Sequence, residues 1–295
     1  MNTRQFSVVI VLFMFLYSAV GFGIGAAIAD QDDGAVKSKF GWTKRVMTEK
    51  ELEKVYQGDA NLSPSVSLRI LAKLNARDFD YIAQDIREGK PIKVPNDFAV
   101  FAQWSPLQNY IPDLADLPKF ILIVKDIPFI GWYENGNLVG DSYVCVGKVE
   151  GSTREGLYAV KEKDIKHVSR SYPNAWGVPA PMPWALRIYE TVWIHAGDIV
   201  GGYCSHGCIN LPIFPAAKLF DWATLGTPVL IVDSLGAVPS VLAKNRSNCT
   251  LHASACGGRE KVSSVDWKKN WYTDAKTFMD SHKAELAGMN EKAEM

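Results

Sequence analysis

Two histidines and a cysteine lie close together in the second half of the chain. His195 ends an apolar run, and a glycine-rich stretch then leads into residues 203–211 (YCSHGCINL), which contain His206 and Cys208. A cysteine reacts as its thiolate, and a nearby imidazole is a common means of removing the thiol proton near neutral pH. These residue types at this spacing indicate cysteine-dependent acyl transfer.

Each residue of this segment has a chemical reason to be there. Cys208 is the predicted nucleophile, and the missing side chain of Gly207 lets a substrate carbonyl approach the backbone. Backbone N–H groups of residues 206–208 on such a turn could stabilise an oxyanion. We assign His195 as the base that moves the proton, because it ends a predicted buried strand and is rigidly placed. His206 is too close in sequence to Cys208 to aim at its sulfur easily, so we expect it to support the turn or the acyl oxygen.

Two other interpretations of the segment are weaker. A glycine-rich surface loop would not need so many reactive residue types within fourteen positions. A zinc site built from Cys204, Cys208, His195 and His206 lacks a Cys-x-x-Cys pair, and three residues between two cysteines is poor zinc-site spacing. We therefore predict no metal and no cofactor.

The N-terminus predicts export. Arg4 precedes an uncharged run over residues 6–28, which ends in Ala27-Ile28-Ala29 before an acidic stretch. A positive start, an apolar core and an Ala-x-Ala site describe a secretory signal peptide over residues 1–29. The run is also long enough to remain as a membrane tether. Either interpretation places the rest of the chain in the periplasm or cell envelope.

Export changes the interpretation of the five cysteines, because the destination is oxidising. Cys249 and Cys256 lie in a polar loop and are predicted to form a disulfide. Cys145, Cys204 and Cys208 remain, which is an odd number. One thiol must stay free unless chains pair, and this fits a catalytic cysteine.

Composition excludes one class of function. The 32 basic and 32 acidic residues give no net charge, so nucleic-acid binding is not expected.

Residues 30–103 are predicted to form a helical region, with short helices over residues 48–56, from residue 64, and over residues 79–86. Residues 74–95 are weakly similar to a LysM glycan-binding module, but a small helical packing region is the preferred interpretation.

Residues 104–235 predict a mainly β catalytic domain, a sandwich or barrel, because many short strands alternate with turn signals. A helix is expected over residues 215–223, and the extension 236–295 is polar with a charged helix over 271–289. The predicted strands cover residues 120–124, 129–133, 138–146, 156–160, 186–189, 191–194 and 228–232.

The reactive segment resembles the signature of the L,D-transpeptidases with a YkuD-type catalytic domain. That signature is a histidine followed at a distance by Ser/Thr-His-Gly-Cys-hydrophobic-Arg/Asn, and His195 with residues 205–210 (SHGCIN) matches it. The resemblance covers about residues 104–233. Its weaker landmarks are Trp104-Ser105-Pro106, Asn135-Gly136, Gly147-Lys148, Thr153 to Gly156, Pro181 to Trp184 and Gly226 to Val229.

The resemblance implies a β-rich exported enzyme that acts on peptidoglycan stem peptides in cell-wall synthesis. It assigns Cys208 as nucleophile and His195 as proton donor and acceptor. Cys208 would attack the meso-diaminopimelate carbonyl of a donor tetrapeptide and release D-alanine. An acceptor amine would then give a 3-3 crosslink or attach a protein such as an envelope lipoprotein. Hydrolysis by water, which gives a carboxypeptidase or amidase, and a non-catalytic envelope-binding protein are the alternatives.

Several positions depart from the common pattern of the family. Asn210 stands where many members have arginine, which removes a fixed cation that would hold a substrate carboxylate. Ala196 replaces a frequent glycine, and Arg154 replaces the proline of the usual Thr-Pro-x-Gly turn. Cys204 replaces a small apolar residue. It is expected either to form an inhibitory disulfide with Cys208 under oxidation or to be a buried inert thiol.

Other residues near the motif are candidates for contact with the substrate. Ser205 and Asn210 belong to the signature, and Trp184 and Tyr203 could form the walls of a cleft for the stem peptide. Trp176 is a more ambiguous candidate, and hydrophobic packing is an equally good account of each aromatic residue. Cys145 is expected to be a core residue.

Overall fold

The computed structural model describes residues 41–174 and 176–247. The predicted signal peptide, the Cys249–Cys256 disulfide and the helix over residues 271–289 lie outside the described residues. Within the described ranges, no helix is long and apolar enough to cross a membrane.

Residues 41–103 contain the predicted helices, which lie in the chain between two paired strands. Strand β1 (Trp42–Val46) pairs in antiparallel fashion with β2 (Pro91–Pro95). The helices between them are α1 (Glu49–Gly58), α2 (Pro64–Asn75) and α3 (Phe79–Arg87), and α4 (Phe98–Phe101) follows. The side chains of Thr48 and Ser63 cap α1 and α2. The helices are confirmed, and the strand pair is an addition to the prediction.

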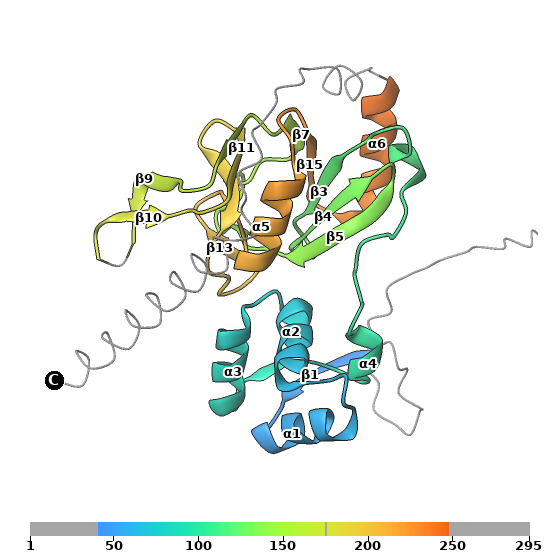
Figure 1. Ribbon diagram of the computed structural model, residues 1–295, viewed down its shortest axis with the longest axis vertical. Coiled ribbons are helices and arrows are strands. Elements are labelled where there is room, and N and C mark those ends of the chain that lie inside the picture. Colours follow the sequence, from blue (N-terminus) through green and yellow to red (C-terminus); the bar gives the residue numbers. More distant parts are fainter. Residues whose placement is uncertain (1–40, 175, 248–295) are drawn as a thin grey trace, which may run out of the picture. The chain divides into compact units, whose positions relative to one another are not determined.

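A five-stranded sheet forms the centre of the next region (Figure 1). Its order is β5 (Asn137–Tyr143), β4 (Phe129–Glu134), β3 (Phe120–Val124), β15 (Pro228–Val232) and β7 (Gly156–Ala159). Along β3, Phe120, Leu122 and Val124 join one core cluster, whereas Ile121 and Ile123 join another. Successive side chains of a strand point to opposite faces, so this sheet is buried on both sides. The continuous apolar runs of β3 and β15 follow from this burial.

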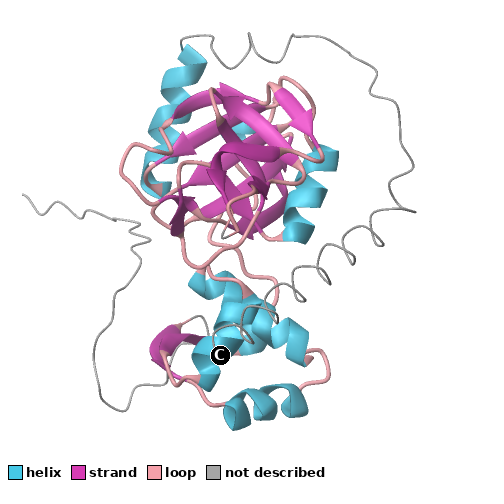
Figure 2. Cartoon of the chain, turned by 90° about the vertical axis from the view of Figure 1, so that its left-hand side faces the viewer, coloured by secondary structure: helices cyan, strands magenta, loops and turns pink. Residues whose placement is uncertain are grey.

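A four-stranded sheet packs against one face of the first and carries the reactive segment. Its order is β14 (Ile209–Leu211), β12 (Val192–Ala196), β11 (Ala185–Tyr189) and β8 (Glu162–Asp164). The shared core includes Ile121, Ile123 and Ile231 from the first sheet and Leu186, Ile194 and Ile209 from the second. Two short pairs complete the strands, β6 (Val146–Gly147) with β13 (Tyr203–Ser205) and β9 (Val168–Pro173) with β10 (Pro179–Pro181). The predicted mainly β fold of this region is therefore confirmed (Figure 2).

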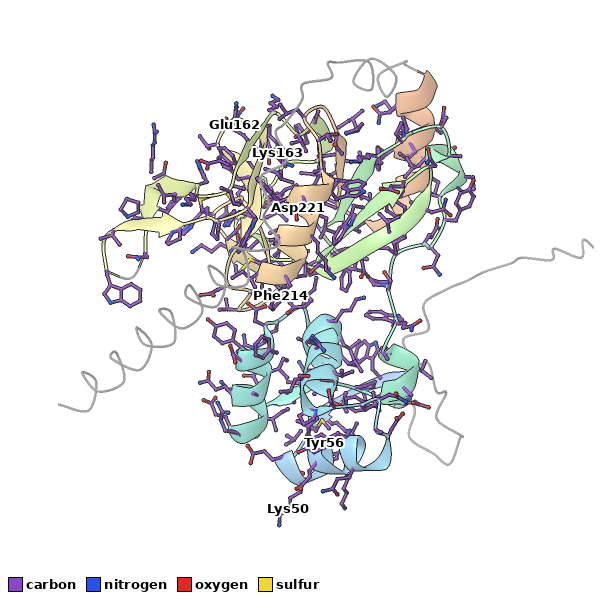
Figure 3. All side chains as sticks on the ribbon, viewed as in Figure 1. Lys50, Tyr56, Glu162, Lys163, Phe214 and Asp221 are labelled. Atoms are coloured by element: carbon purple, nitrogen blue, oxygen red, sulfur yellow. A yellow bond between two sulfur atoms is a disulfide. The ribbon has the colours of Figure 1, made fainter. Side chains whose placement is uncertain are left out.

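Helix α5 (Ile213–Trp222) covers the shared core after the reactive segment. It includes the predicted helix, and it is held at its C-terminal end by Lys163 of β8. The Lys163 ammonium donates to the carbonyl of Phe220, and to that of Ala223 at 2.7 Å (Figure 3). A cation beside the carbonyl end of a helix is favourable, because it satisfies acceptors that have no partner within the helix.

The packing of the catalytic domain continues beyond residue 235. A 3-10 turn, η2 (Leu235–Ala237), leads into α6 (Val238–Ser247). Val238 and Leu242 are buried in the same core cluster as Leu122, Leu230 and Val232. The first part of the predicted polar extension therefore covers one face of the five-stranded sheet.

The core of the five-stranded sheet gives a stability prediction. Leu230 of β15 is fully buried, so Leu230→Ala is expected to lower the free energy of unfolding by about 2–5 kcal/mol. Leu225 is 40% exposed, and Leu225→Ala should change it by no more than about 0.5 kcal/mol. Urea denaturation of both variants tests this. Equal effects would contradict the placement of Leu230.

Candidate active site

The reactive side chains lie on the outer face of the four-stranded sheet. Strands β12 and β14 are parallel neighbours, and His195 pairs in register with Asn210. Ile194 and Ile209 point into the core between the sheets. Because side chains alternate along a strand, His195 and Asn210 share the opposite face, and Cys208 precedes β14 two positions before Asn210. The register therefore places the predicted base and the predicted nucleophile on the same face of this sheet.

The ring of His195 is oriented by a backbone carbonyl. Its Nδ1 lies 2.7 Å from the carbonyl oxygen of Ala196. A carbonyl only accepts hydrogen bonds, so Nδ1 carries the proton and Nε2 has the free lone pair. Burial lowers the pKa of His195 to about 4, because the charged ring is poorly solvated there, although the hydrogen bond to Ala196 opposes this shift. The imidazole is therefore a neutral base at pH 7.

Gly197 leaves room for this arrangement. A Cβ atom at Gly197 would lie 3.0 Å from Asn210 Nδ2 and 3.3 Å from His195 Cε1. The side chain of Asn210 occupies this space and donates from Nδ2 to the carbonyl of Asp198 at 3.2 Å. Asn210 therefore ties the strand of the nucleophile to the segment that follows the base.

The thiol of Cys208 lies in an apolar setting. It packs against Met182, Ala185 and Trp193, and its Sγ is 3.9 Å from the carbonyl oxygen of Thr191. Burial raises the pKa of the Cys208 thiol, and a hydrogen bond with the backbone of Trp193 opposes this only in part. The hydrogen bonds described for the thiol and for His195 are to the backbone. The resting site therefore holds a neutral thiol and a neutral imidazole.

The turn before Cys208 is held together by the Ser205 hydroxyl. This group accepts from the Gly207 N–H at 3.0 Å and donates to the Cys208 carbonyl at 2.6 Å. Ser205 was predicted to contact the substrate, but both of its hydroxyl interactions lie within the turn. The Gly207 N–H, predicted to face an oxyanion, is likewise already bonded. Ser205 therefore shapes the turn that precedes Cys208.

Gly207 is required at its position for two reasons. Its φ of +139° favours glycine, and a Cβ there would lie 2.7 Å from the carbonyl oxygen of Ser152. Its own carbonyl accepts from Thr153 Oγ1 at 2.8 Å, and Thr153 in turn accepts from the Gly147 N–H at 2.9 Å. Thr153 was recognised in the sequence only as a family landmark. The structure shows that it fixes the turn before the nucleophile.

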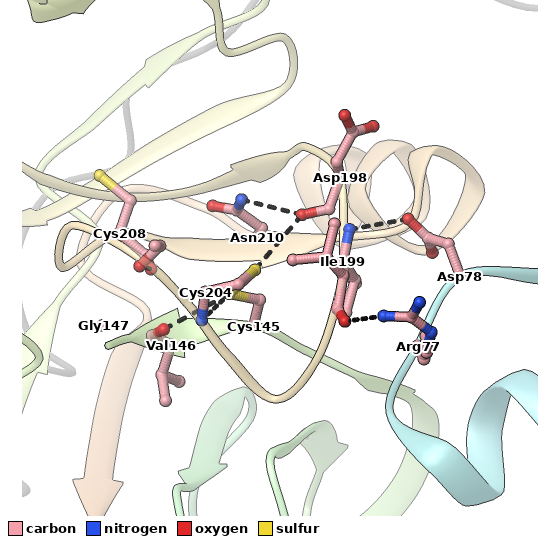
Figure 4. Close-up of a disulfide and its surroundings, with 12 residues drawn as sticks. Arg77, Asp78, Cys145, Val146, Gly147, Asp198, Ile199, Cys204, Cys208 and Asn210 are labelled. Carbon is pink, nitrogen blue, oxygen red and sulfur yellow. Dashed lines mark hydrogen bonds between the residues drawn. A yellow bond between two sulfur atoms is a disulfide. The ribbon is translucent and has the colours of Figure 1, made fainter. Parts of the chain in front are cut away.

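Both states expected for Cys204, an inhibitory disulfide with Cys208 and a buried inert thiol, are wrong. Cys204 forms a disulfide with Cys145 (Figure 4), which leaves Cys208 as the free cysteine among the described residues. Cys145 is a core residue as predicted, but it is not a thiol. The zinc alternative loses Cys204 as a ligand, and the described part of the chain has no group of three or more His, Cys, Asp or Glu that could hold a metal.

The aromatic candidates divide between packing and exposure. His206 is exposed, and its ring stacks on that of Tyr172 in β9, with centroids 4.1 Å apart. Tyr203 is 54% exposed, and its hydroxyl donates to the carbonyl of Lys125 at 2.7 Å. Trp184 packs against the core between the sheets, whereas Trp176 is exposed beyond β9. Tyr203, His206 and Trp176 are therefore the exposed rings among these candidates.

Sequence reasoning missed His167. Its ring stacks on Trp193 with centroids 3.9 Å apart, and its Nδ1 lies 3.1 Å from the Asp164 carboxylate. Trp193 in turn packs against Cys208, and His167 contributes to the lowered pKa of His195. The only signal in the sequence is the Asp164-x-x-His167 spacing, which is common on surfaces and becomes informative once β8 and β12 are in one sheet.

Comparison with known families agrees with this geometry. Residues 118–231 match the family model of the YkuD L,D-transpeptidase catalytic domain. This part of the chain is therefore similar to a YkuD-type L,D-transpeptidase catalytic domain. The match ends before α6 and begins after the helical region, so it covers the two sheets and the reactive segment.

Solved structures of L,D-transpeptidases are similar to parts of the chain. The Enterococcus faecium catalytic domain is 28% identical, with 39% of this chain and 96% of that chain covered and a TM-score of 0.33. Mycobacterium tuberculosis L,D-transpeptidase 1 is 25% identical, with 39% of this chain and 61% of that chain covered and a TM-score of 0.34. The Stackebrandtia nassauensis L,D-transpeptidase is 16% identical, with 69% of this chain and 100% of that chain covered and a TM-score of 0.41. The match spans about three fifths of the mycobacterial relatives. No curated protein gives a significant match.

Two glycines of the transpeptidase domain give a matched prediction. Gly207→Ala would force a side chain against the Ser152 carbonyl at a positive φ, at a cost of about 1–3 kcal/mol in the free energy of unfolding. A Cβ at Gly201 would meet nothing within 4 Å, so Gly201→Ala is the control. Thermal unfolding and alkylation of Cys208 should both change for Gly207→Ala alone. Equal behaviour of the two variants would contradict the tight turn.

The neutral thiol predicts a pH profile. The rate at which iodoacetamide alkylates Cys208 should be low at pH 7 and still rising at pH 9, because burial raises the pKa of the thiol above its ordinary value. Peptide-resolved mass spectrometry of the full chain gives this rate for Cys208 separately from other cysteines. A plateau already reached between pH 5 and 7 would instead indicate a thiolate–imidazolium pair and would contradict the neutral site.

Proposed function

We propose that the chain is a cysteine-dependent L,D-transpeptidase that acts on the tetrapeptide stems of peptidoglycan. The observation that carries this proposal is the register of β12 and β14, which places His195 and Cys208 on one face within a YkuD-type domain. The substrate follows from the family, which acts on peptidoglycan stem peptides.

The first half-reaction forms a thioester. As the Cys208 sulfur attacks the meso-diaminopimelate carbonyl, the thiol proton passes to Nε2 of His195. The Ala196 carbonyl, bonded to Nδ1, stabilises the imidazolium that forms. When the tetrahedral intermediate collapses, the bond to D-alanine breaks and the proton moves from His195 to the leaving amine. Because both groups begin neutral, proton transfer accompanies the attack.

The oxyanion requires donors other than Gly207. The Gly207 N–H is bonded to Ser205, so the backbone N–H groups of His206 and Cys208 are the proposed donors. The short turn fixed by Ser205 and Thr153 keeps these groups rigid, which is the condition for stabilising charge without reorganisation. This assignment revises the one made from the sequence.

The substrate contacts are proposed from exposure and position. The exposed rings of Tyr203 and His206, five and two residues before Cys208, are the proposed contacts, whereas Trp184 packs against the core between the sheets. Asn210 shares the face of His195, but its amide already donates to Asp198, so its oxygen is the group that remains for the substrate.

The second half-reaction decides the product. An acceptor amine attacks the thioester, loses its proton to His195 and releases Cys208. A second stem peptide as acceptor gives a 3-3 crosslink, and a protein acceptor such as an envelope lipoprotein gives an attached protein. We propose these in the periplasm, with residues 1–29 as the export signal or residues 6–28 as a tether. Hydrolysis of the same thioester by water is the alternative outcome.

Incubation with purified disaccharide-tetrapeptide tests the proposal. Wild type should release D-alanine and form a dimer that mass spectrometry detects. Cys208→Ala should give neither, because the nucleophile is absent. His195→Ala should lower the rate by about 10²–10⁴-fold, because the proton transfer loses its base.

The product masses separate the alternatives. Loss of D-alanine without a dimer would indicate hydrolysis. Equal inertness of wild type and Cys208→Ala, together with no acylation of Cys208 by a carbapenem, would contradict the proposed enzyme and favour a binding protein built on this fold.

A further inference from the structure

The segment between the base and the nucleophile is tethered within the catalytic domain. After His195, the Gly197 N–H donates to the Leu211 carbonyl at 3.0 Å, and Asn210 holds the Asp198 carbonyl. At the other end, Cys204 is bonded to Cys145. Residues 197–204 therefore connect His195 directly to the turn that presents Cys208.

The same segment is also held by the loop between α2 and α3. The Asp78 N–H donates to the Ile199 carbonyl, and the Ile199 N–H donates to Asp78 Oδ2, both at 2.8 Å. The Arg77 guanidinium donates to the Val200 carbonyl (Figure 4). Ile199 is fully buried. This backbone is therefore held by three hydrogen bonds from two consecutive residues of the helical region.

The side chain of Asp78 is diverted from its usual local role. Asp78 stands at the N-cap of α3, where a carboxylate normally accepts from the first N–H groups of the helix. Here it makes no such bond and instead accepts from Ile199 and, at Oδ1, from the Tyr143 hydroxyl at 3.0 Å. The helix loses a cap, and the segment beside the active site gains an acceptor.

The buried position of Asp78 also disfavours the charged form of its carboxyl group. Burial raises the pKa of Asp78 to about 6, while the hydrogen bonds from Ile199 and Tyr143 oppose the shift, and the nearby Asp198 and Asp80 add to it. A carboxyl group in such a place satisfies two donors that would otherwise be buried without a partner. An apolar residue would fill this space equally well but would not accept the hydrogen bonds from Ile199 and Tyr143.

We propose that Asp78 is a positioning residue for acyl transfer, which holds residues 197–204 through Ile199 and thereby fixes the distance between His195 and Cys208. This inference rests on the proposed function for its effect on rate, but the hold on the segment is independent of it. Asp78 touches neither the thiol nor the imidazole. Its effect is through the backbone that joins them, where a displacement of about 1 Å can cost about a hundredfold in rate.

Variants at Asp78 separate the hold on the segment from the charge. Asp78→Ala removes the acceptor and leaves the Ile199 N–H and the Tyr143 hydroxyl without it. Asp78→Asn keeps both contacts, because its amide oxygen accepts from Ile199 and its NH₂ donates to the Tyr143 oxygen. Asp78→Ser provides a good cap for α3 but is too short to reach Ile199, so it keeps the helix if Asp78→Ala fails to fold.

Lys73 provides the matched control. Its ammonium lies 2.8 Å from the Asp141 carboxylate, which links α2 to β5 as Asp78 links the start of α3 to the segment. Neither Lys73 nor Asp141 hydrogen-bonds to residues 197–204 in the described structure. Lys73→Met therefore removes a link between the same two regions without touching the segment.

Two measurements on the full chain test the inference. Stopped-flow acylation of Cys208 by a carbapenem gives the rate constant at saturation and the half-saturating concentration. Hydrogen exchange gives the protection of residues 197–204. Asp78→Ala and Asp78→Ser should lower the rate constant at saturation by about tenfold or more, with little change in the half-saturating concentration, and should speed exchange in the segment. Asp78→Asn and Lys73→Met should resemble wild type in both.

The contrary outcomes are distinct. Unchanged hydrogen exchange and an unchanged acylation rate in Asp78→Ser would overturn the inference. An equal loss of acylation rate in Lys73→Met would also overturn it, because any lost link between the helical region and the sheets would then have the same effect. If wild type is not acylated at all, the proposed function fails. The exchange comparison then still decides whether Asp78 holds the segment.

Discussion

The parallel register of β12 and β14 is the constraint on which the active site depends. It sets His195 opposite Asn210 and leaves Cys208 at the entrance to β14, with the intervening residues as the connection. The register is fixed in turn by the core side, where Ile194, Ile209 and Leu211 are buried between the two sheets. A shift of one residue in this register would turn these apolar side chains outward and bury Asn210, which pairs with His195. The apolar core therefore determines which residues lie on the opposite face, where Cys208 and His195 are.

This constraint also explains the electrostatic character of the site. His195 lies on a central strand and is shielded from water, and the Cys208 thiol packs on Trp193 and is also poorly solvated. Burial therefore disfavours both the imidazolium and the thiolate before substrate binds. Charge then arises only during reaction, where the Ala196 carbonyl and the rigid turn are already aligned. For the proposed enzyme this gives selectivity, because an uncharged thiol reacts slowly with electrophiles that are not positioned by the site.

Much of the catalytic domain could be predicted from the sequence because its strands are locally distinctive. The apolar runs at 120–124 and 228–232 coincide with β3 and β15, and the Asn135-Gly136 turn joins β4 to β5. The short strands β8, β13 and β14 could not be predicted, since three-residue elements carry no periodicity and exist through their partners. Within the site, Cys208 and His195 were predicted from type and spacing, and the register of β12 and β14 places them on one face. The roles of Asp78, Thr153 and His167 could not be, because each depends on a contact between residues distant in the chain.

The Cys145–Cys204 bond joins residues 59 positions apart, whereas Cys208 lies only four residues from Cys204. In an unfolded chain the shorter loop closes at a smaller cost in entropy, so oxidation before folding would favour the pair that disables the nucleophile. The native pairing is favoured over this one when β13 pairs with β6, next to Cys145, before the sulfurs are oxidised. On this account the correct cross-link depends on the order of events as well as on redox conditions: the strands pair first, the disulfide forms second, and Cys208 is left as a free thiol.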